Sequence, residues 1–465
     1  MADQNRRNNR GSKSGSRKSG GRSGGGGGRN RSGGGNRTDG GNRSGGGNRS
    51  NNSNRRRRSR SRNRNRDNTD NGQRREERQD YQEYVEANGE IEPGEIQTGV
   101  VDVVAEGFGF LRNPVTLELG GGDAYVPTNL VKKFRLKTGQ LISGPVRPPQ
   151  NREKHPAMQT IETVEGMDPE EAAVLPNLQD LTPLVPNERL ILENDPLDRG
   201  TRIIDLLVPV GKGTRGIIVA PPKGGKTMLL QETARAVAAN HPDIPLYILL
   251  IDERPEEVTD FRSMGIGNVV ASSFDSAPQS HLRIAELCIE RCQRLVEAGQ
   301  DVFMLLDSLT RLTRTVNVAK RGSGRALSGG LDSNALLFPR KLLGAARNIE
   351  NGGSLTILAT ALVETDSRMD EVIFEEFKGT GNWELKLDRK LAERRLFPAF
   401  DLSLSGTRRE ELLYTPDEFE AVRHLRRNLL DSAVNPVSQM EAIIRLLDKN
   451  KTNHEIIDEM LTIVR

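Results

Sequence analysis

The sequence has few aromatic residues, few cysteines and no long apolar run. Its 465 residues include two cysteines, one tryptophan, five tyrosines and 12 phenylalanines. Cys288 and Cys292 lie four residues apart in a window with helical periodicity, and no further soft metal ligands lie near them in the sequence. We therefore expect both thiols to have a structural role in a reducing cytoplasm.

Apolar runs are also too short for a membrane span. None approaches the roughly 18 residues that a membrane-spanning helix requires. The N-terminus has no apolar stretch after its charged residues, whereas a signal peptide would have one. We therefore expect a cytoplasmic protein that does not enter a membrane.

The first 70 residues almost lack apolar side chains, because only Met1 and Ala2 belong to that class. They carry 20 Lys and Arg against four Asp and Glu, a net charge of +16, and RSGGGNR occurs at 31–37 and 43–49. Such a segment cannot bury enough surface to offset the entropy of ordering it, so we expect a disordered tail over 1–78. The abundance of Arg favours binding to phosphates, and the lack of aromatic residues predicts electrostatic binding without stacking. A solvated spacer is the alternative.

The charge of the remaining chain is opposite in sign to that of the tail. The whole chain carries +4, so residues 71–465 carry −12. The basic isoelectric point is therefore a property of the tail. Any nucleic-acid site on the folded part must be a local patch.

Beyond the tail, composition and hydrophobic periodicity change several times. Short β-like runs separated by Gly, Pro and Asn predict a small barrel, and long apolar strands alternating with helices predict a mostly parallel α/β sheet covered on both faces. The strands are expected at 216–220, 246–252, 302–307 and 354–363, with helices after Lys226 and at about 279–298 and 331–349. The expected order is a tail at 1–78, a short helix or linker at 79–94, the barrel at 95–166, a linker at 167–200, the α/β domain at 201–411 and its helical C-terminal part at 412–465.

A phosphate-binding loop follows the first of these strands. The residues APPKGGKT occupy 220–227, between an apolar strand and a helix, which is the context that a P-loop requires. Gly224 and Gly225 would let backbone N–H groups face the phosphates, and the helix N-terminus adds a partial positive charge. Lys226 would reach the β- and γ-phosphates, and Thr227 would hold Mg²⁺ through its hydroxyl. The consensus first glycine is Ala220 here.

Two later strands end in carboxylates. Glu253 follows LLID in LLIDERPEEV, and Asp307 ends the strand VFMLLD. One acidic residue at a strand end is often only a helix cap, but two such ends in a P-loop domain favour a catalytic site. We expect Glu253 to orient and deprotonate the attacking water and Asp307 to hold Mg²⁺.

The barrel segment contains two phenylalanines in GFGFLR. Phe108 and Phe110 point to the same face of a strand, with Arg112 close by and Tyr125 following in DAYVP. Rings on a solvent-facing strand form a platform on which single-stranded bases stack. Two core phenylalanines are the alternative, but the motif resembles the RNA-binding strand of cold-shock OB folds.

Longer motifs make the resemblance specific. Residues 95–465 resemble the bacterial Rho family of transcription termination factors through, in order, GIIVAPPKGGKTMLLQ, LLIDERPEEVTD, LLDSLTRL, LSGGLDSNAL, GAARNIENGGSLTILATALVETDSRMDEVIFEEFKGTGNWEL and ERRLFPAFDLSLSGTRREELL. The resemblance implies a RecA-like ATPase core after an OB-fold barrel. It further implies a homohexameric ring that uses ATP and Mg²⁺ to translocate along nascent, C-rich single-stranded RNA and to dislodge RNA polymerase.

The resemblance also implies a nucleotide site. Arg408 would be an arginine finger that reaches the nucleotide of the adjacent subunit, Arg395 would approach phosphate from that interface, and Phe397 would stack on adenine. The implied catalytic residues are Lys226, Glu253, Asp307 and Arg408, the implied metal ligands are Thr227 and Asp307, and the implied nucleotide contacts are Lys223, Gly224, Gly225, Lys226, Thr227, Met228, Arg254, Arg395 and Phe397.

The implied RNA contacts lie in the barrel and in two pore loops. Loop 322–330 would contribute Arg325 and Ser328, and loop 364–371 would contribute Arg368; the family commonly has lysine where the two arginines stand. The implied barrel contacts are Phe108, Phe110, Arg112, Asp123, Tyr125, Glu153 and Lys154, with Asp123 accepting a hydrogen bond from cytosine. His155 stands where the family usually has tyrosine, and the family's usual helical bundle before the barrel is expected to be missing.

Two other functions fit parts of the sequence. One is a RecA- or F1-like ATPase that acts on DNA or a rotor, and the GFGFLR barrel and the pore loops argue against it. The other is an RNA-binding scaffold with a vestigial ATPase, and the intact Lys226, Glu253, Asp307 and Arg408 argue against that.

Overall fold

The computed structural model describes most of the chain that follows the basic tail. The described residues are 92, 94–118, 120, 123–150, 153–319, 327–432 and 435–464. The predicted tail at 1–78, most of the predicted helix or linker at 79–94, and Arg325 lie outside these ranges.

A small barrel opens the described part of the chain. Its five strands pair in the closed order β1-β2-β3-β5-β4-β1, and β6 pairs with β4. Every second residue of β4 is buried, as expected where one face of a sheet packs on a core. The small barrel predicted from the sequence is confirmed, with two short helices that the sequence did not suggest. Its elements are β1 (Ile96–Val103), β2 (Gly109–Arg112), β3 (Tyr125–Val126), α2 (Thr128–Lys133), β4 (Leu141–Arg147), β5 (Ala157–Met158), β6 (Thr163–Val164) and α3 (Pro169–Ala172).

The α/β part is built on a nine-stranded sheet. Its main path is β12-β11-β13-β15-β10-β16-β17, in which the neighbours from β12 to β16 are parallel and β17 is antiparallel to β16. Two short strands, β14 and β7, extend it from β15 by antiparallel pairing. The strands are β7 (Pro183–Leu184), β10 (Arg215–Ala220), β11 (Leu246–Glu253), β12 (Asn268–Ser273), β13 (Asp301–Asp307), β14 (Arg347–Ile349), β15 (Ser354–Leu362), β16 (Trp383–Lys386) and β17 (Gly406–Thr407), with β8 (Arg189–Leu190) and β9 (Val210–Gly211) forming a separate pair.

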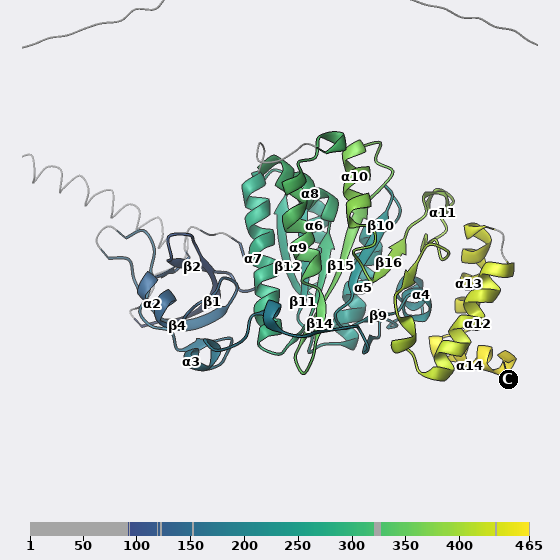
Figure 1. The fold of residues 1–465 in the computed structure, drawn as a ribbon, viewed down its shortest axis with the longest axis horizontal. Helices are drawn as coiled ribbons and strands as arrows, with labels where there is room; N and C mark the ends of the chain where they lie inside the picture. The colour runs from purple at the N-terminus through teal and green to yellow at the C-terminus, as the bar shows by residue number, and fades with distance from the viewer. Residues whose placement is uncertain are drawn as a thin grey trace, which may run out of the picture. The chain divides into compact units, whose positions relative to one another are not determined.

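Helices cover both faces of this sheet. Successive residues of one strand enter different cores: Ile218 packs with the helices α4, α5, α6 and α12 to α14, whereas Ile217 packs with α7 to α10. This is the period of two that a strand imposes, and the predicted parallel α/β architecture is confirmed. Figure 1 shows α8, α9 and α10 in front of the strands. The helices are α4 (Arg199–Leu207), α5 (Lys226–Asn240), α6 (Pro255–Ser263), α7 (Pro278–Glu297), α8 (Leu309–Ala319), α9 (Leu337–Gly344), α10 (Arg368–Phe377), α11 (Arg389–Glu393), α12 (Pro416–Ser432), α13 (Pro436–Lys449) and α14 (Asn453–Val464), with short 3₁₀ turns at Leu178–Asp180, Ser328–Gly330, Ser333–Leu336 and Glu410–Leu412.

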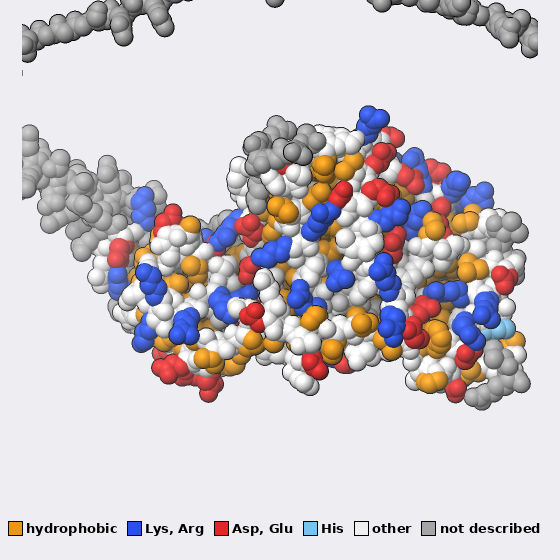
Figure 2. Space-filling model, in the orientation of Figure 1, with side chains coloured by type: hydrophobic (Ala, Val, Ile, Leu, Met, Phe, Trp, Pro, Cys, Tyr) orange, Lys and Arg blue, Asp and Glu red, His pale blue; other side chains and the backbone are white. Residues whose placement is uncertain are grey.

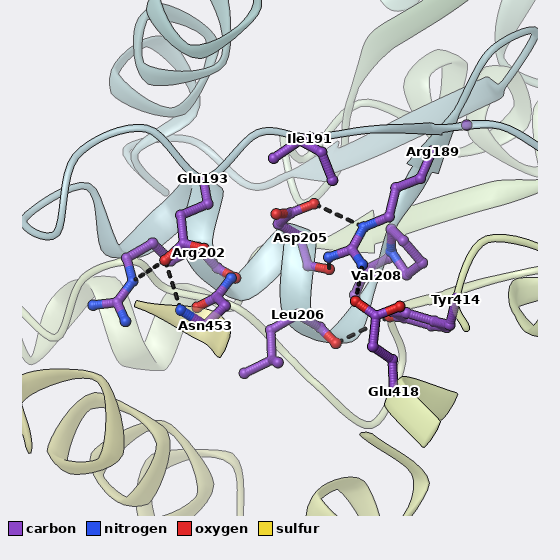
Figure 3. Close-up of polar contacts among 12 residues, drawn as sticks. Arg189, Ile191, Glu193, Arg202, Asp205, Leu206, Val208, Tyr414, Glu418 and Asn453 are labelled. Atoms are coloured by element: carbon purple, nitrogen blue, oxygen red, sulfur yellow. Dashed lines mark hydrogen bonds and ion pairs between the residues drawn. The ribbon is translucent and has the colours of Figure 1, made fainter. Parts of the chain in front are cut away.

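A buried polar network joins α4 to the C-terminal helices (Figure 3). Arg202 of α4 donates hydrogen bonds to the carbonyls of Leu447 (3.2 Å) and Asn450 (3.0 Å) at the end of α13, and its Nε lies 3.3 Å from Glu193 Oε1. Asn453, at the start of α14, donates its side-chain N–H to the Arg202 carbonyl (2.9 Å). The last carbonyls of a helix lack partners within the helix, so Arg202 caps α13 and fixes it to the α/β part.

The barrel contacts the α/β part through α7. Arg291 of α7 donates to Glu165 (2.6 Å) and to the Gly139 carbonyl (3.2 Å). In the segment that follows the barrel, the backbone N–H of Leu178 donates to Glu297 of α7 (2.8 Å). Gly139 has φ +92°, and a Cβ there would overlap the backbone at Glu290. Glycine at 139 therefore permits the turn before β4 to rest directly on α7.

One predicted helix differs from the structure. The helix expected at about 331–349 is shorter, because the chain leaves α9 at Gly344 and forms β14 at Arg347–Ile349. Within the described ranges, no helix combines the length and apolar character needed to cross a membrane. Figure 2 shows Lys and Arg side chains scattered among Asp and Glu over the visible face, so a nucleic-acid site there depends on local groups.

Candidate nucleotide and RNA sites

The P-loop joins β10 to α5. Ala220 is the last residue of β10, the Gly224 N–H donates to the Pro221 carbonyl (3.1 Å), and α5 begins at Lys226. Gly225 has φ +91°, a left-handed conformation that favours glycine. A Cβ at this position would also stand 3.3 Å from the Phe397 ring. Both facts explain why Gly225 precedes the helix, whose N-terminus is free to face an anion.

Lys226 meets the two predicted carboxylates at the carboxyl edge of the sheet. Its ammonium forms ion pairs with Asp307 and, at 3.4 Å, with Glu253 Oε2. The strands that end in these residues, β11 and β13, are adjacent and parallel, and Asp307 pairs with Leu250, so Glu253 lies three residues further along the same edge of the sheet. Glu253 and Asp307 are both buried. The structure thus brings together three residues predicted from separate motifs.

A backbone irregularity directs the Glu253 side chain toward Lys226. The register between β11 and β12 shifts between Ile251 and Glu253, and Asp252 between them has φ +57°. A bulge of this kind redirects a side chain relative to the regular pleat, and a non-glycine residue in the left-handed region is uncommon. No pattern in the sequence predicted this irregularity.

Burial and charge act on these groups in opposite directions. Burial raises the pKa of Glu253 by more than Lys226 lowers it, and the smaller effects of Asp307, which raises the pKa, and Arg311, which lowers it, leave it above its ordinary value. Burial lowers the pKa of Lys226, but Asp307 and Glu253 outweigh that effect and hold it above its ordinary value. Glu253 is therefore a stronger base than an exposed glutamate, and Lys226 stays charged.

Three further residues that were not predicted from the sequence complete the polar site. Arg311 of α8 donates to Glu253 Oε1 (3.1 Å), Thr360 of β15 donates to Asp307 Oδ1 (2.7 Å), and Glu257 of α6 accepts from the Thr227 hydroxyl (3.0 Å). Arg311 lies four residues after Asp307 in LLDSLTRL. Its position one helical turn after the end of an apolar strand could have indicated a side chain close to the site. Nothing in the sequence around Thr360 singled it out.

The side chains of Met228 and Phe397 line a slot beside the P-loop. It is a cavity of about 120 Å³ lined by both side chains together with Gly224 and Gly225. Met228 is 59% exposed in the first turn of α5, so its side chain is open to a ligand. Phe397, which the resemblance assigned to stacking on adenine, thus lies beside Met228, one of the implied nucleotide contacts.

Lys223 and Arg395 share a neighbouring cavity of about 540 Å³. Arg254 is exposed at the start of α6.

Arg408 does not lie near the P-loop. Its backbone N–H donates to the carbonyl of Asn382 at the amino end of β16 (2.8 Å), and its guanidinium donates to the carbonyl of Gly379 (3.5 Å). Because β16 runs parallel to β10, Arg408 lies at the edge of the sheet opposite the P-loop.

The barrel carries a cluster of aromatic rings. Phe108 lies 5.7 Å from Phe110 and 5.3 Å from Tyr125, and His155 lies 5.1 Å from Phe110, all between ring centroids. All four side chains are half-buried, and neither phenylalanine belongs to the barrel's buried core cluster. The rings are therefore available at the surface, which core phenylalanines would not be.

Ion pairs surround these rings. Arg112 pairs with Asp102 (3.1 Å) and with Asp123, and Arg283 of α7 pairs with the same Asp102. Burial raises the pKa of Asp123, while Arg112 lowers it by less. Asp102 is almost fully buried, so one carboxylate connects the predicted RNA face of the barrel to the α/β part.

The outer predicted barrel contacts lie on a separate stretch. Glu153 accepts two hydrogen bonds from Arg147 (2.5 and 2.7 Å), and Lys154 lies next to it in the chain. The interaction with Arg147 lowers the pKa of Glu153. Glu153 is therefore charged at neutral pH.

The two predicted pore loops lie against each other. A Cβ on Gly329, which has φ +73°, would stand 2.8 Å from the Met369 backbone, so Ser328 comes close to the start of α10, where Arg368 stands. Asp370 in that first turn accepts from Arg314 of α8 (2.7 and 2.6 Å). The second loop is therefore tied to the helix that follows Asp307. Arg325 lies outside the described residues.

Comparisons with known proteins match both the barrel and the α/β part of the chain. Residues 97–170 match the family described as "Rho termination factor, RNA-binding domain", and residues 200–407 match the "ATP synthase alpha/beta family, nucleotide-binding domain". Among solved structures, an ATPase of the type III secretion system of pathogenic bacteria has a similar fold, with a TM-score of 0.50 and 22% identity over 61% of this chain and 87% of the other.

Curated relatives share much more of the sequence. The transcription termination factor Rho of Bacillus subtilis is 49% identical over 375 residues, 80% of this chain and 87% of that protein. The Rho of Aquifex aeolicus is 50% identical over 78% of this chain and 84% of that protein. The Rho of Streptomyces lividans is 53% identical over 76% of this chain and 49% of that protein. With an RNA-binding barrel, an ATPase core and identity of this extent, the chain belongs to the Rho family of transcription termination factors, which are RNA-dependent ATPases and helicases.

Proposed function

We propose that this Rho-family chain works as a homohexameric ring that binds C-rich single-stranded RNA, hydrolyses ATP with Mg²⁺, moves along the RNA and dislodges RNA polymerase. The observation that carries the proposal is the convergence of Lys226, Glu253 and Asp307 at the end of the P-loop. Such a site suits phosphoryl transfer to water, which needs positioning and charge neutralisation.

The roles of the three residues follow from their contacts. Lys226 lies between the two carboxylates, and the phosphates of a nucleotide at the N-terminus of α5 would attract its ammonium away from Glu253. The freed Glu253 carboxylate orients and deprotonates the attacking water, for which its raised pKa is suited. Arg311 keeps the carboxylate in place through its 3.1 Å hydrogen bond.

The oxygen ligands at the site fit Mg²⁺ bound together with a nucleotide. Mg²⁺ is held by one or two protein oxygens in addition to phosphates and water, and Thr227 and Asp307 offer a hydroxyl and a carboxylate. Within the described ranges, no group of three His, Cys, Asp or Glu forms a metal site without a nucleotide. When bound, the ion would neutralise charge that develops on the phosphate oxygens.

The position of Arg408 supports catalysis between subunits. Gly216 is paired with Trp383, and Trp383 with Thr407, so Arg408 starts near the first residues of β10. The P-loop begins four residues later, about 13 Å along the strand at ~3.3 Å per residue. An arginine finger at this edge serves the nucleotide of a neighbouring subunit, where it contributes ~10³–10⁵-fold in rate.

RNA would contact the chain at two places. The half-buried rings of Phe108, Phe110 and Tyr125 offer stacking surfaces beside Arg112 and Asp123, which carry donors and an acceptor for a base edge. Arg368 and Ser328 would contact the strand in the ring's pore. The salt bridge between Arg314 and Asp370 connects the pore loop to the helix after Asp307, so movement of that loop can follow the state of the nucleotide.

An RNA-stimulated ATPase assay tests this function. ATP turnover should rise when poly(C) is added, and Lys226→Ala should abolish turnover while RNA binding to the barrel persists. Phe108→Ala with Phe110→Ala should weaken binding to C-rich strands about ten- to ten-thousand-fold, because each stacking interaction is worth about 1–3 kcal/mol. Near-normal turnover in Lys226→Ala would refute the nucleotide site. Early melting with unchanged RNA affinity in the double variant would show that the rings belong to the core.

A further inference from the structure

The slot between Met228 and Phe397 contains one acidic side chain that the roles above do not use. Glu232 follows Met228 by four residues on α5, so both side chains project from the same face of the helix. Both line the cavity of about 120 Å³, whose other lining side chains include Leu197, Leu229 and Leu387. Of the residues that line this cavity, Glu232 is the acidic one.

The backbone opposite makes room for this carboxylate. Gly200 is the second residue of α4 and also lines the cavity. A Cβ at Gly200 would overlap Glu232 Oε2. Any larger residue at 200 would push the carboxylate out of its position at the wall of the slot.

No neighbouring group compensates fully for the charge of Glu232. Burial and then repulsion by Asp198 raise the pKa of Glu232 to about 7, and attraction by Arg235 lowers it by less, with no hydrogen bond among these influences. Arg199 of α4 also lines the slot, but it is paired with Asp448 of α13 (2.7 Å). The segment Phe397–Phe400 brings no titratable group.

We propose that Glu232 selects the base of the bound nucleotide, its carboxylate accepting a hydrogen bond from the exocyclic amine of adenine. The inference rests on the proposed function, in which the slot beside the P-loop receives the base. Adenine has an amine donor where guanine has a carbonyl acceptor. A carboxylate that faces the carbonyl of guanine leaves two acceptors without a donor, which is the arrangement that sites discriminate against most strongly.

The protonation of Glu232 gives this selection a pH dependence. The charged carboxylate accepts from the adenine amine, so ATP is favoured above pH 7. The protonated acid carries an O–H that can donate to the guanine carbonyl. The preference for ATP over GTP therefore falls as pH drops from 8 to 6 through the pKa of about 7.

Comparison of kcat/KM for ATP and GTP at saturating RNA tests the proposal. Glu232→Gln replaces the carboxylate by an amide, which can accept from adenine or donate to guanine. In this variant the ATP-to-GTP ratio at pH 8 should fall by between about ten- and one-hundred-fold, mainly through better use of GTP. Its ratio should also no longer change between pH 8 and 6, whereas the wild-type ratio falls.

Two controls separate this proposal from the proposed function. Glu420→Gln makes the same substitution on α12, where Glu420 forms an exposed pair with Arg423, and should keep the wild-type ratio and its pH dependence. Lys226→Ala tests the nucleotide site itself, since turnover of both nucleotides should vanish together. If Lys226→Ala is inactive but Glu232→Gln keeps the wild-type ratio, Glu232 does not read the base. Equal losses for ATP and GTP with a lower melting temperature would likewise overturn the proposal, because they would make Glu232 a support for α4.

Discussion

At the scale of single residues, the environment of Glu253 sets its chemistry. The carboxylate is removed from water, faces Asp307 and receives a hydrogen bond from Arg311. The bulge at Asp252 fixes the direction of the side chain. Because the backbone sets the position of the Glu253 side chain, a substitution that keeps its shape should impair hydrolysis and leave the fold of the site intact.

Glu253→Gln should therefore retain nucleotide and hydrolyse it poorly. The amide keeps the shape but cannot take a proton, and removal of a positioned base typically costs about 10²–10⁴-fold in rate. Single-turnover hydrolysis and nucleotide affinity should be measured on the same preparation. If affinity falls as far as the rate, Glu253 is a binding residue.

The fall of ATP turnover at low pH, its acid limb, provides a second measurement on Glu253. Burial and Asp307 raise the pKa of Glu253, so turnover should be full above that pKa and fall as the pH drops through it. This limb should lie above the usual glutamate range. It should be absent from the residual activity of Glu253→Gln, and a limb that persists there belongs to another group.

At the scale of elements, α4 holds the C-terminal helices to the ATPase core. Arg202 is fully buried and bonds to the last carbonyls of α13, while Arg199 on the same helix forms an exposed pair with Asp448. Exposed pairs contribute about 0–1 kcal/mol. Removal of one partner from a buried pair costs about 3–5 kcal/mol.

Arg202→Ala should thus destabilise the ATPase part by about 3–5 kcal/mol, because the last carbonyls of α13 would lose their donor and Glu193 would lose its ion-pair partner. Arg199→Ala, which cuts the other link between the same two helices, should cost no more than about 1 kcal/mol. Urea unfolding without nucleotide compares the two variants. Similar shifts of the two midpoints would mean that Arg202 contributes no more than a surface pair.

At the scale of the whole molecule, the sheet separates Arg408 from its own P-loop. The proposed ring would close this gap by placing each Arg408 beside the nucleotide of the next subunit. Mixing Arg408→Ala subunits with Lys226→Ala subunits tests that arrangement. Some mixed rings would regain one competent interface and show activity above either parent. No recovery at any ratio, in rings shown to mix, would count against an arginine finger at Arg408.

The basic tail is the other property of the whole chain. Its +16 opposes the −12 of the remainder, and it has no aromatic residue. Deletion of residues 1–70 should weaken binding to long C-rich and A-rich RNA equally and leave short oligonucleotides on the barrel nearly unaffected. The slope of log K against log salt should become shallower by about 0.7 for each phosphate that the tail neutralises. An unchanged slope on long RNA would identify the tail as a spacer.

The sequence by itself determined the elements whose signal is local. The P-loop lies between a strand and a helix, Glu253 and Asp307 end apolar strands, and alternating apolar residues form the barrel, because hydrophobic periodicity and turn residues act over a few positions. The tertiary structure alone decided what depends on contacts between distant segments. Thr360 lies against Asp307 because β15 pairs with β13, Glu232 reaches the slot beside the P-loop because Gly200 of α4 leaves room for it, and Arg408 is separated from the P-loop because β16 runs parallel to β10. Such partners are set by strand order and helix packing, and no spacing along the chain encodes them.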